Sequence, residues 1–489
     1  MNPGFLDFSS LEKRLHFCHE EVRLNRRFAP GLYLGVVPIG GPPSAPRVGD
    51  DSGGEIEGGV KLVQFDESAR LDALPEAGRL PAEHCRRLGR EIARIEGTLA
   101  VADRSAGHGS PERLADVFAM NISQIRRHRP DLAGRADAVG AWLRERLVRD
   151  RQAFLARLEG GRIRECHGDL HLANIVLLDG MPVAYDCIEF NPDLRWIDVA
   201  SDVAFVTMDL AGRGRPDLAA EVTSAWMEAA DDHAAASVLS VHRVARAVVR
   251  AAVAAIRAAQ EGGAPADARV ARADTERYLA LAESLSSPCM PRLVVVTGPS
   301  GSGKSTLAGT CVARLEGVRL RSDVERKRLF GMGPTDRAEG PRAAALYSPE
   351  TTRRVYERLA TLARGLLAAG ATVVVDATGN SRWQREILAA AARETGAGIA
   401  WLEIDLPLET LLARVADRWR SGTDPSDATA ETVRLQVRSR DPITPAELAA
   451  CPAPATHLVL DAARLACPGR IIDDATAAFA APGATEAIR

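Results

Sequence analysis

The chain has 489 residues, which is too many for one ordinary hydrophobic core and predicts two large domains. Its 62 basic and 65 acidic residues give a net charge of −3, which argues against bulk affinity for nucleic acid or membranes. The eight cysteines show neither CxxC nor a metal-ligand spacing, and no signal peptide or long apolar run is apparent. We therefore expect a cytoplasmic protein, and the sequence gives no indication of its oligomeric state.

The first 285 residues combine a short mixed segment with mostly helical sequence. A capping box at Ser9 and Glu12 and apolar residues at helical spacing predict a helix over residues 9–28. Strands are expected at 33–37 and 60–65, on either side of a loop rich in Pro, Gly and Asp. Helical patterns follow over 81–158 and 198–282. A segment with the composition of a linker ends at residue 292, so we expect domains at 1–285 and 293–489, joined by 286–292.

Residues 165–190 carry the spacing of a kinase catalytic loop. The motif HGDLHLAN places Asp169 five residues before Asn174, and an Asp-Gly turn predicts a hairpin of residues 175–178 and 181–185. Asn174 enters this hairpin and Asp186 leaves it, so their oxygens should converge in a site that suits Mg²⁺ on substrate phosphates. Asp169 would orient the acceptor hydroxyl or take its proton. The alternative is an ordinary polar hairpin with His167 as a core residue.

This segment, together with FLDFSSLEKR before it and DLRWIDVASDVAFVTMDL after it, resembles the aminoglycoside phosphotransferase branch of the protein-kinase-like fold over residues 5–285. The resemblance implies phosphoryl transfer to a small-molecule hydroxyl, and a helix glutamate that pairs with a lysine on an earlier strand. Glu21 is the expected glutamate. Only eight residues precede its helix and none is lysine, while Lys13 and Lys61 lie in the wrong elements. We therefore expect an incomplete N-lobe: either the true start lies upstream of Met1, or this domain is a degenerate kinase.

After residue 292, strands at 293–297, 318–320, 372–375, 398–404 and 456–459 alternate with helices, which predicts a parallel sheet. The segment GPSGSGKST directly follows the first strand and matches the phosphate-binding loop GxxxxGK[ST]. Its backbone amides should surround the α- and β-phosphates, its lysine should reach the β- and γ-phosphates, and its serine hydroxyl should bind Mg²⁺. The residues expected to bind the nucleotide are Gly298, Ser300, Gly301, Ser302, Gly303, Lys304, Ser305 and Thr306.

Two aspartates follow later strands of this sheet. Asp376 ends an apolar strand and is expected to hold Mg²⁺ through water, the alternative being a turn residue. Asp323 lies at the mouth of the sheet, where it could accept the proton of a substrate hydroxyl. Alternatively, Ser322 and Glu325 form a capping box, and Asp323 only favours the N-terminus of a helix.

Basic residues near these aspartates are also candidates. Arg414 and Arg418 share one face of a helix at i, i+4 and could close on the transferring phosphate as a lid, or they could form a solvated face. Arg326 and Lys327 are expected to be surface charges, the alternative being contacts to substrate or phosphate. Residues 293–461 resemble the zeta-toxin-like and gluconate-kinase-like group of phosphate-loop kinases. Because no guanine-binding NKxD motif is present, ATP is preferred to GTP.

The sequence thus predicts a kinase-like α+β domain with a mostly helical C-lobe, fused to an α/β phosphate-loop domain. The expected function is transfer of the ATP γ-phosphate, with Mg²⁺, to a small-molecule acceptor at one or both sites. The alternative is a nucleotide-regulated binding or sensor protein, in which the first domain is degenerate and the second acts as an ATPase switch.

Overall fold

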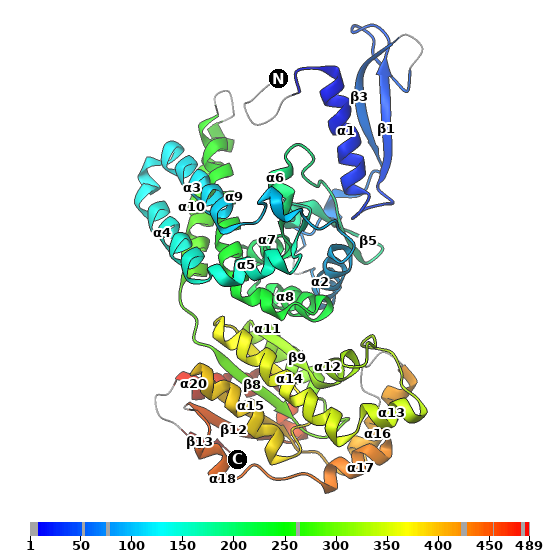
Figure 1. Ribbon diagram of the computed structural model, residues 1–489, viewed down its shortest axis with the longest axis vertical. Coiled ribbons are helices and arrows are strands. Elements are labelled where there is room, and N and C mark those ends of the chain that lie inside the picture. Colours follow the sequence, from blue (N-terminus) through cyan, green and yellow to red (C-terminus); the bar gives the residue numbers. More distant parts are fainter. Residues whose placement is uncertain are drawn as a thin grey trace. The chain divides into compact units, whose positions relative to one another are not determined.

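The computed structural model describes residues 8–50, 54–74, 79–260, 265–421, 428–452, 454–480 and 485–488. The chain forms two compact units, whose elements are labelled in Figure 1. Unit 1 comprises Met1–Ala230 and Val238–Ser287, and unit 2 comprises Asp231–Ser237 and Pro288–Arg489. The expected combination of a largely helical first half and a parallel sheet in the second half is confirmed.

Unit 1 opens with a helix packed on a small antiparallel sheet (Figure 1). Helix α1 (Leu11–Asn25) lies against β1 (Tyr33–Gly40) and β3 (Glu55–Leu62), and β1 also pairs with the short β2 (Arg47–Val48). The Ser10 hydroxyl accepts a hydrogen bond from the Lys13 amide at 3.3 Å, so the capping box expected at Ser9 is wrong by one residue. Strand β3 starts earlier than expected because its pairing with β1 extends back to residue 55.

The rest of unit 1 is mainly helical around a short hairpin. Its strands form two antiparallel pairs: β4 (Ile163–Glu165) with β7 (Trp196–Asp198), and β5 (Ile175–Leu178) with β6 (Met181–Ala184). The helices are α2 (Ala82–Glu96), α3 (Pro111–His128), α4 (Ala133–Arg149), α5 (Arg151–Glu159), α6 (Pro192–Arg195), α7 (Val199–Gly212), α8 (Pro216–Ala230), α9 (Ala236–Ala259) and α10 (Pro265–Ser286).

Helix α7 forms the centre of this helical part. Every residue from Val199 to Leu210 is buried, which its nearly continuous apolar sequence explains. Two aspartates, Asp202 and Asp209, are buried among these apolar residues. Buried carboxylates require hydrogen-bond partners, and both find them in the HGDLHLAN segment.

Unit 2 is built on a parallel sheet with the strand order β13-β12-β11-β8-β10-β9. Its strands are β8 (Arg292–Thr297), β9 (Val318–Arg321), β10 (Thr372–Asp376), β11 (Gly398–Ile404), β12 (Ala455–Leu460) and β13 (Thr485–Ile488), the last of which the sequence analysis missed. The central strands are rich in Val and Ile and are buried on both faces, as parallel strands between helices must be.

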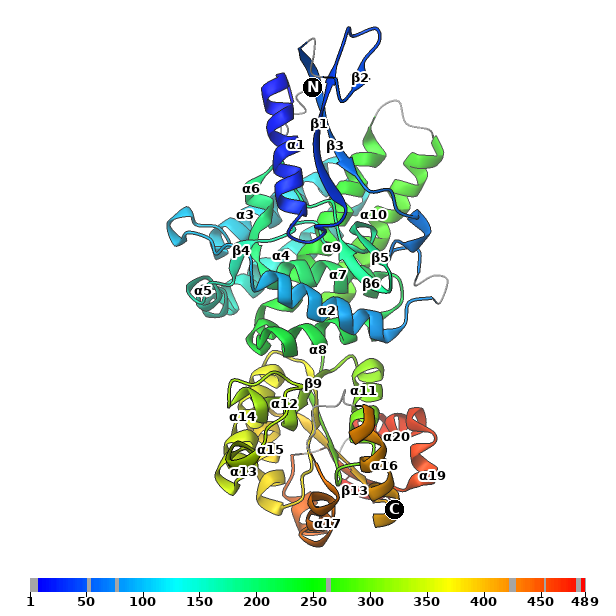
Figure 2. The same cartoon turned by 90° about the vertical axis from the view of Figure 1, so that its right-hand side faces the viewer.

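Helices cover both faces of this sheet, as Figure 2 shows. The helices α14 (Pro349–Ala368) and α15 (Arg382–Thr395) pack on one face, and α11 (Lys304–Leu315) and α20 (Pro468–Ala480) pack on the other. The remaining helices are α12 (Ser322–Arg328), α13 (Gly340–Leu346), α16 (Leu408–Ser421), α17 (Ala430–Arg438), α18 (Pro445–Ala449) and α19 (Ala462–Leu465).

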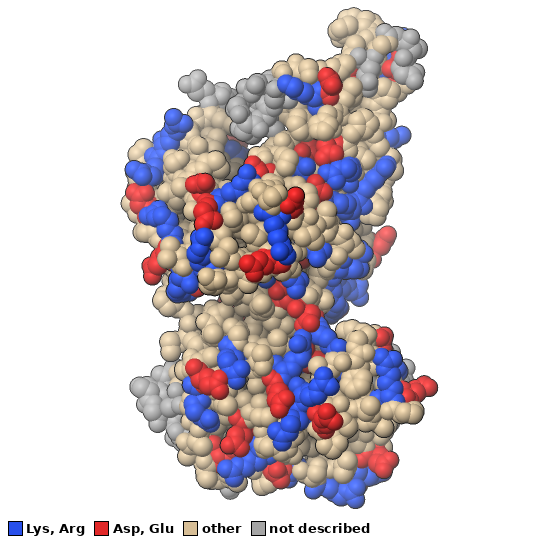
Figure 3. All heavy atoms as spheres, in the orientation of Figure 1, with Lys and Arg blue, Asp and Glu red and all other residues tan. Residues whose placement is uncertain are grey.

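Charged side chains of both signs are interspersed on the face of each unit shown in Figure 3. This distribution accords with the small net charge of the chain. Within the described part of the chain, no helix combines the length and apolar composition needed to cross a bilayer.

Candidate functional site

The phosphate-binding loop of unit 2 connects β8 to α11. Gly298, Gly301 and Gly303 have φ values of +138°, +84° and +98°, a region that favours glycine. A Cβ atom at Gly301 would lie 2.7 Å from the carbonyl oxygen of Leu411. The loop ends at Lys304, the first residue of α11, so the amides of the helix N-terminus face the loop. This geometry is that of an anion-binding site.

Lys304 and Ser305 extend from the start of α11 toward polar partners. The Lys304 ammonium donates a hydrogen bond to the Pro299 carbonyl oxygen at 2.8 Å, so it lies across the loop. The Ser305 hydroxyl donates to Asp376 Oδ2 at 2.9 Å, and Arg319 donates to the same carboxylate oxygen. The loop and the carboxyl end of β10 therefore form one polar cluster.

Asp376 is buried in this cluster and is ionised. Burial alone would raise the pKa of its carboxyl, but the Arg319 and Lys304 charges and the hydrogen bonds from Arg319 and Ser305 lower the pKa. The described residues contain no group of three His, Cys, Asp or Glu side chains that could hold a metal ion. Ser305 and Asp376 fit an Mg²⁺ ion that takes most of its ligands from nucleotide oxygens and water.

The two arginines considered as candidates for a lid lie on α16. Arg414 Nη1 donates a hydrogen bond to the Ser302 carbonyl oxygen at 3.3 Å and lies 3.7 Å from the Cβ position of Gly303. Its guanidinium thus reaches the phosphate-binding loop. The side chain of Arg418 lies outside the described residues.

Asp323 occupies the first turn of α12, after the end of β9. The capping box expected at Ser322 and Glu325 is wrong, because Ser322 lies inside the helix and Arg321 is its N-cap residue. Glu325 is instead buried and forms ion pairs with Arg328 and Arg358. The position of Asp323 at the carboxyl edge of the sheet is unchanged by this correction.

Arg326 and Lys327 were expected at the surface, and this prediction is wrong. Lys327 is fully buried, and its ammonium donates to the Pro334 carbonyl oxygen at 3.1 Å. Arg326 donates to the Leu346 carbonyl oxygen at 2.9 Å and stacks on the Tyr347 ring. Both residues are buried because α12 packs against α14, and they hold the segment that follows their own helix.

Sequence reasoning missed the residues that support this loop from distant segments. Gln436 of α17 accepts a hydrogen bond from the Ser300 amide at 2.8 Å, and its own carbonyl accepts one from Asn380 at 3.0 Å. Arg385 is buried, donates to the Gly379 carbonyl oxygen at 2.8 Å and pairs with Glu447 at 2.6 Å. The contacts of Gln436 and the Arg385 pair with Glu447 join residues more than 50 positions apart, so no local sequence pattern indicates them. Only the Arg385 contact with Gly379 is local.

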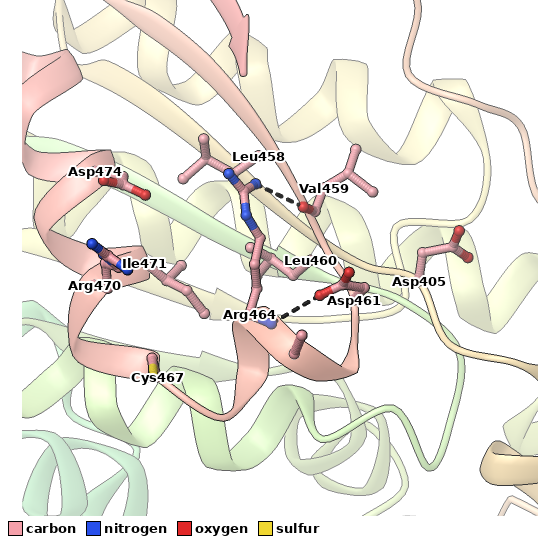
Figure 4. A pocket seen from close by; sticks show the side chains of 11 residues that line it. Asp405, Leu458, Val459, Leu460, Asp461, Arg464, Cys467, Arg470, Ile471 and Asp474 are labelled. Carbon is pink, nitrogen blue, oxygen red and sulfur yellow. Dashed lines mark hydrogen bonds between the residues drawn. The ribbon is translucent and has the colours of Figure 1, made fainter. Parts of the chain in front are cut away.

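A cavity of about 870 Å³ opens beside the carboxyl end of β12 (Figure 4). Leu458 and Ile471 supply apolar lining, and Asp405 and Arg464 are among its polar lining residues. The Arg464 side chain donates to the Val459 carbonyl oxygen at 3.0 Å, which fixes its orientation. The lining thus combines apolar side chains with charged groups of both signs.

In unit 1, helix α7 positions the HGDLHLAN loop. The two carboxylate oxygens of Asp202 accept hydrogen bonds from the His167 amide at 2.7 Å and the Gly168 amide at 3.0 Å. Asp209, two turns later, accepts one from the Leu172 amide at 3.1 Å. The sequence analysis assigned no role to these aspartates, which act as positioning residues for the loop backbone.

Asp169 extends from this loop as an ionised carboxylate. His171 Nε2 lies 3.4 Å from Asp169 Oδ2, and the Asn174 amide donates to the same oxygen at 3.3 Å. Burial would raise the pKa of Asp169, but the His171 hydrogen bond and the His171, His167 and Arg246 charges lower it to about 2. At neutral pH Asp169 is therefore a negative charge that can accept a hydrogen bond.

The hairpin expected after this loop is confirmed. Ile175 of β5 pairs with Ala184 of β6, and the Tyr185 amide donates to the Asn174 carbonyl oxygen at 2.9 Å. Asp186 follows directly, with φ at +64° and an exposed side chain. The structure thus brings Asn174 and Asp186 to the open end of the hairpin. His167 is a core residue, as the alternative interpretation held, and it bonds to the Tyr185 carbonyl oxygen.

Glu21 of α1 faces other carboxylates. Burial, followed by the charges of Glu189 and Asp186, raises its pKa to about 7. Within the described residues Glu21 forms no ion pair with any Lys or Arg, although the resemblance implies a lysine partner. Its helix is instead tied to the buried Glu165, just before the HGDLHLAN loop. Arg23 of α1 pairs with this carboxylate at 2.9 Å, and Arg27, two residues beyond the helix, pairs with it at 3.2 Å.

Two family models match separate parts of the chain. Residues 9–239 match the model of the phosphotransferase enzyme family, and residues 293–443 match the model of an AAA domain. Uncharacterized proteins of Mycobacterium tuberculosis and Mycobacterium bovis are 32% identical over 443 residues, which cover 89% of this chain and 85% of those proteins.

Solved structures show weaker likeness. A gluconokinase from Sinorhizobium meliloti is 18% identical, with a TM-score of 0.27 over 39% of this chain and 93% of its own. The APS kinase of M. tuberculosis is 20% identical, with a TM-score of 0.27 over 40% of this chain and 100% of its own. An ethanolamine kinase from Plasmodium vivax is 10% identical, with a TM-score of 0.34 over 55% of this chain and 72% of its own.

These TM-scores are low, and the family assignment rests on the sequence relatives and the two family models. The models confirm both resemblances inferred from the sequence, to a phosphotransferase and to a phosphate-loop domain. They support a phosphotransferase function. The chain belongs to the same family as the mycobacterial proteins, and it joins a phosphotransferase-family domain to an AAA domain.

Proposed function

We propose that this protein is a fused phosphotransferase, in which each unit binds ATP with Mg²⁺ and transfers the γ-phosphate to a hydroxyl of a small molecule. The observation that carries the proposal is the phosphate-binding loop, with Lys304 lying across it and Ser305 hydrogen-bonded to Asp376. The match to the phosphotransferase family supports the same chemistry in unit 1. A reducing cytosol would keep all eight cysteines as the free thiols that the structure shows.

In unit 2, the amides of the loop and Lys304 would hold the phosphates of ATP. A bound Mg²⁺ would neutralise charge that develops on the phosphate oxygens, and Ser305 and Asp376 are the residues that would hold it. Arg414, which already contacts the loop, would offset negative charge on the transferring group. Asp323 would accept the proton of the acceptor hydroxyl at the carboxyl edge of the sheet.

In unit 1, Asp169 would orient the acceptor hydroxyl, and Asn174 and Asp186 would hold the metal. The acceptor oxygen forms a bond to the γ-phosphorus, and the bond between that phosphorus and the β,γ-bridging oxygen breaks to release ADP. The hydroxyl proton leaves to solvent by way of the Asp169 carboxylate. With a pKa of about 2 this carboxylate is a weak base, so its main contribution is orientation.

One observation favours a second candidate function for unit 1. Glu21 has carboxylate neighbours and no basic partner among the described residues. A kinase-like domain without the lysine that grips the α- and β-phosphates would bind a ligand and transfer phosphate slowly or not at all. Unit 1 would then act as a sensor, and unit 2 as an ATP-dependent switch.

Acceptor-dependent turnover separates the two functions. The full chain is incubated with Mg²⁺, ATP and a panel of sugars, aminoglycosides and nucleosides, and products are followed by phosphorus NMR. A phosphorylated acceptor is expected; ATP hydrolysis with no phosphorylated acceptor across the panel would sink the phosphotransferase proposal.

Variants then assign the activity to a unit. Lys304→Ala is expected to lower turnover about a hundredfold or more, because it removes a contact to the transferring phosphate. Asp169→Asn tests unit 1 in the same assay. Lys13→Ala and Asp179→Asn are matched controls at exposed positions. If Asp169→Asn removes all turnover and Lys304→Ala removes none, unit 2 is not the main active site.

A further inference from the structure

Two arginines of α9 lie on the same face of the helix, one turn apart. Arg246 and Arg250 are spaced i, i+4, and both side chains are half-buried. Arg246 Nε donates to the Ser201 hydroxyl at 3.1 Å, and its guanidinium carbon lies 4.8 Å from the centre of the Phe205 ring. The Arg250 guanidinium carbon lies 5.4 Å from the centre of the Tyr278 ring. Both guanidinium groups are thus held in place by aromatic rings.

These arginines are close to the catalytic loop of unit 1. The Phe205 ring that Arg246 covers is also in edge-to-face contact with His171, with ring centres 5.5 Å apart. His171 in turn lies 3.4 Å from the Asp169 carboxylate. Asp169 also interacts electrostatically with Arg246 and with Arg250. Both charges therefore act at the point where the acceptor hydroxyl would lie.

Neither arginine has a carboxylate partner in the described parts of the chain, where no ion pair within 4.0 Å involves Arg246 or Arg250. The nearby carboxylates are already committed to other groups. Both oxygens of Asp202 accept backbone amides of the catalytic loop, and Asp209 binds the Leu172 amide and pairs with Arg213. Most buried arginines of unit 1 differ in this respect, as the Arg157 pair with Asp198 illustrates.

The carboxylates near the two arginines interact with them without contact, so a ligand that touches the guanidinium groups would supply a closer negative charge. The aromatic rings stabilise the two cations only in part. The fork of N–H donors on arginine matches the oxygens of a carboxylate or a phosphate, and it binds neutral hydroxyl groups less strongly. The chemistry of this pair therefore fits an oxyanion.

We propose that the acceptor of unit 1 is an anionic alcohol, whose carboxylate or phosphate group is bound by Arg246 and Arg250 while Asp169 orients its hydroxyl. The proposal rests on the proposed function of unit 1 and narrows its substrate class. It argues against a polycationic acceptor at this pair, because the two guanidinium groups would repel it.

Binding of small probes tests this inference without any need for turnover. Glycerol, glycerate and glycerol 3-phosphate share one scaffold and differ in charge, and each is titrated calorimetrically into the full chain with saturating Mg·ADP, which fills the phosphate-binding loop. At least one anion is expected to bind about tenfold or more tightly than glycerol. The comparison of glycerate with glycerol 3-phosphate shows whether the arginine pair prefers a carboxylate or a phosphate group. Equal affinity for glycerol and both anions, or binding of neither anion, overturns the proposal.

Variants locate the binding to this pair. Arg246→Gln and Arg250→Gln should each weaken binding of the preferred anion about tenfold or more and leave glycerol unchanged, while Arg250→Lys should retain part of the affinity. Arg257→Gln, at an exposed position of the same helix, should match the wild type. Full affinity in both Gln variants contradicts the inference. Anion binding without phosphoryl transfer would refute the proposed function of unit 1 and leave the binding site standing.

Discussion

The unpaired Glu21 gives a sharp prediction about the stability of unit 1. Its carboxyl has a pKa of about 7, compared with an ordinary value of 4.5, because it is partly buried beside Glu189 and Asp186. Between these two pH values the unfolded chain ionises this carboxyl, whereas the folded chain keeps the proton. The free energy of unfolding therefore falls as the pH rises through this window and no longer changes above it.

The substitution Glu21→Gln removes the charge and keeps the shape. A pKa difference of this size corresponds to at most about 3 kcal/mol, at about 1.4 kcal/mol for each pH unit. Since the side chain retains contact with solvent, screening reduces this figure, and we expect a stabilisation of about 1–2 kcal/mol at pH 8. At pH 5, only half a unit above the ordinary pKa, about a quarter of this effect has developed, so the gain should be well below 1 kcal/mol.

The full chain is unfolded in urea, and hydrogen exchange of α1 peptides is monitored by mass spectrometry. This readout reports the stability of unit 1 separately from that of unit 2. Glu20→Gln is the matched control on the same helix. The Arg23 hydrogen bond lowers the pKa of Glu20, so its stabilising effect is complete above pH 4.5 and is lost only in more acidic solution. This control should not gain stability between pH 5 and 8. An equal effect of Glu21→Gln at both pH values would refute the argument.

Three further substitutions test contacts that support the two sites. Asp202→Asn should destabilise unit 1 by about 1–3 kcal/mol and reduce acceptor phosphorylation, because an asparagine has one acceptor oxygen for the two loop N–H groups that Asp202 binds. Urea titration measures the stability, and phosphorus NMR measures the phosphorylation. Gly301→Ala should cost about 1–3 kcal/mol and weaken ATP binding, measured by calorimetry, because a Cβ there would meet Leu411 with φ at +84°. Arg385→Ala should destabilise unit 2 by about 3–5 kcal/mol in urea, because Glu447 would remain buried without its partner.

The parts of the two sites that were predictable from the sequence are those set by short-range geometry. The phosphate-binding loop needs glycines at fixed spacing between a strand and a helix, and the chain adopts this arrangement at residues 298–306. The hairpin after HGDLHLAN follows from an Asp-Gly turn between two apolar runs. In both cases a dozen or so residues contain all the information that the local structure requires.

The missed residues depend on contacts between distant segments. Asp202 accepts a hydrogen bond from the amide of His167, 35 residues away in sequence, and Arg385 pairs with Glu447, 62 residues away. Arg326 and Lys327 were misplaced for the same reason, since their charge predicts exposure unless the packing of α12 on α14 is known. A short helix that is buried on most sides leaves no periodic pattern from which its environment could be inferred.

The distribution of charge in unit 1 places carboxylates and arginines around different parts of its candidate site. Glu21 of α1 lies near the carboxylates of Glu189 and Asp186, which follow β6. A cation bound among these carboxylates would reduce their mutual repulsion. Arg246 and Arg250 of α9 form no ion pair within 4.0 Å in the described residues. Asp169 interacts electrostatically with the arginines and comes from the loop that leads into the hairpin ending at Asp186. A metal-bound nucleotide would supply positive charge near the carboxylates, and an anionic acceptor would supply negative charge near the arginines. Because each ligand completes a different half of this arrangement, affinity for the acceptor should survive even if unit 1 transfers no phosphate.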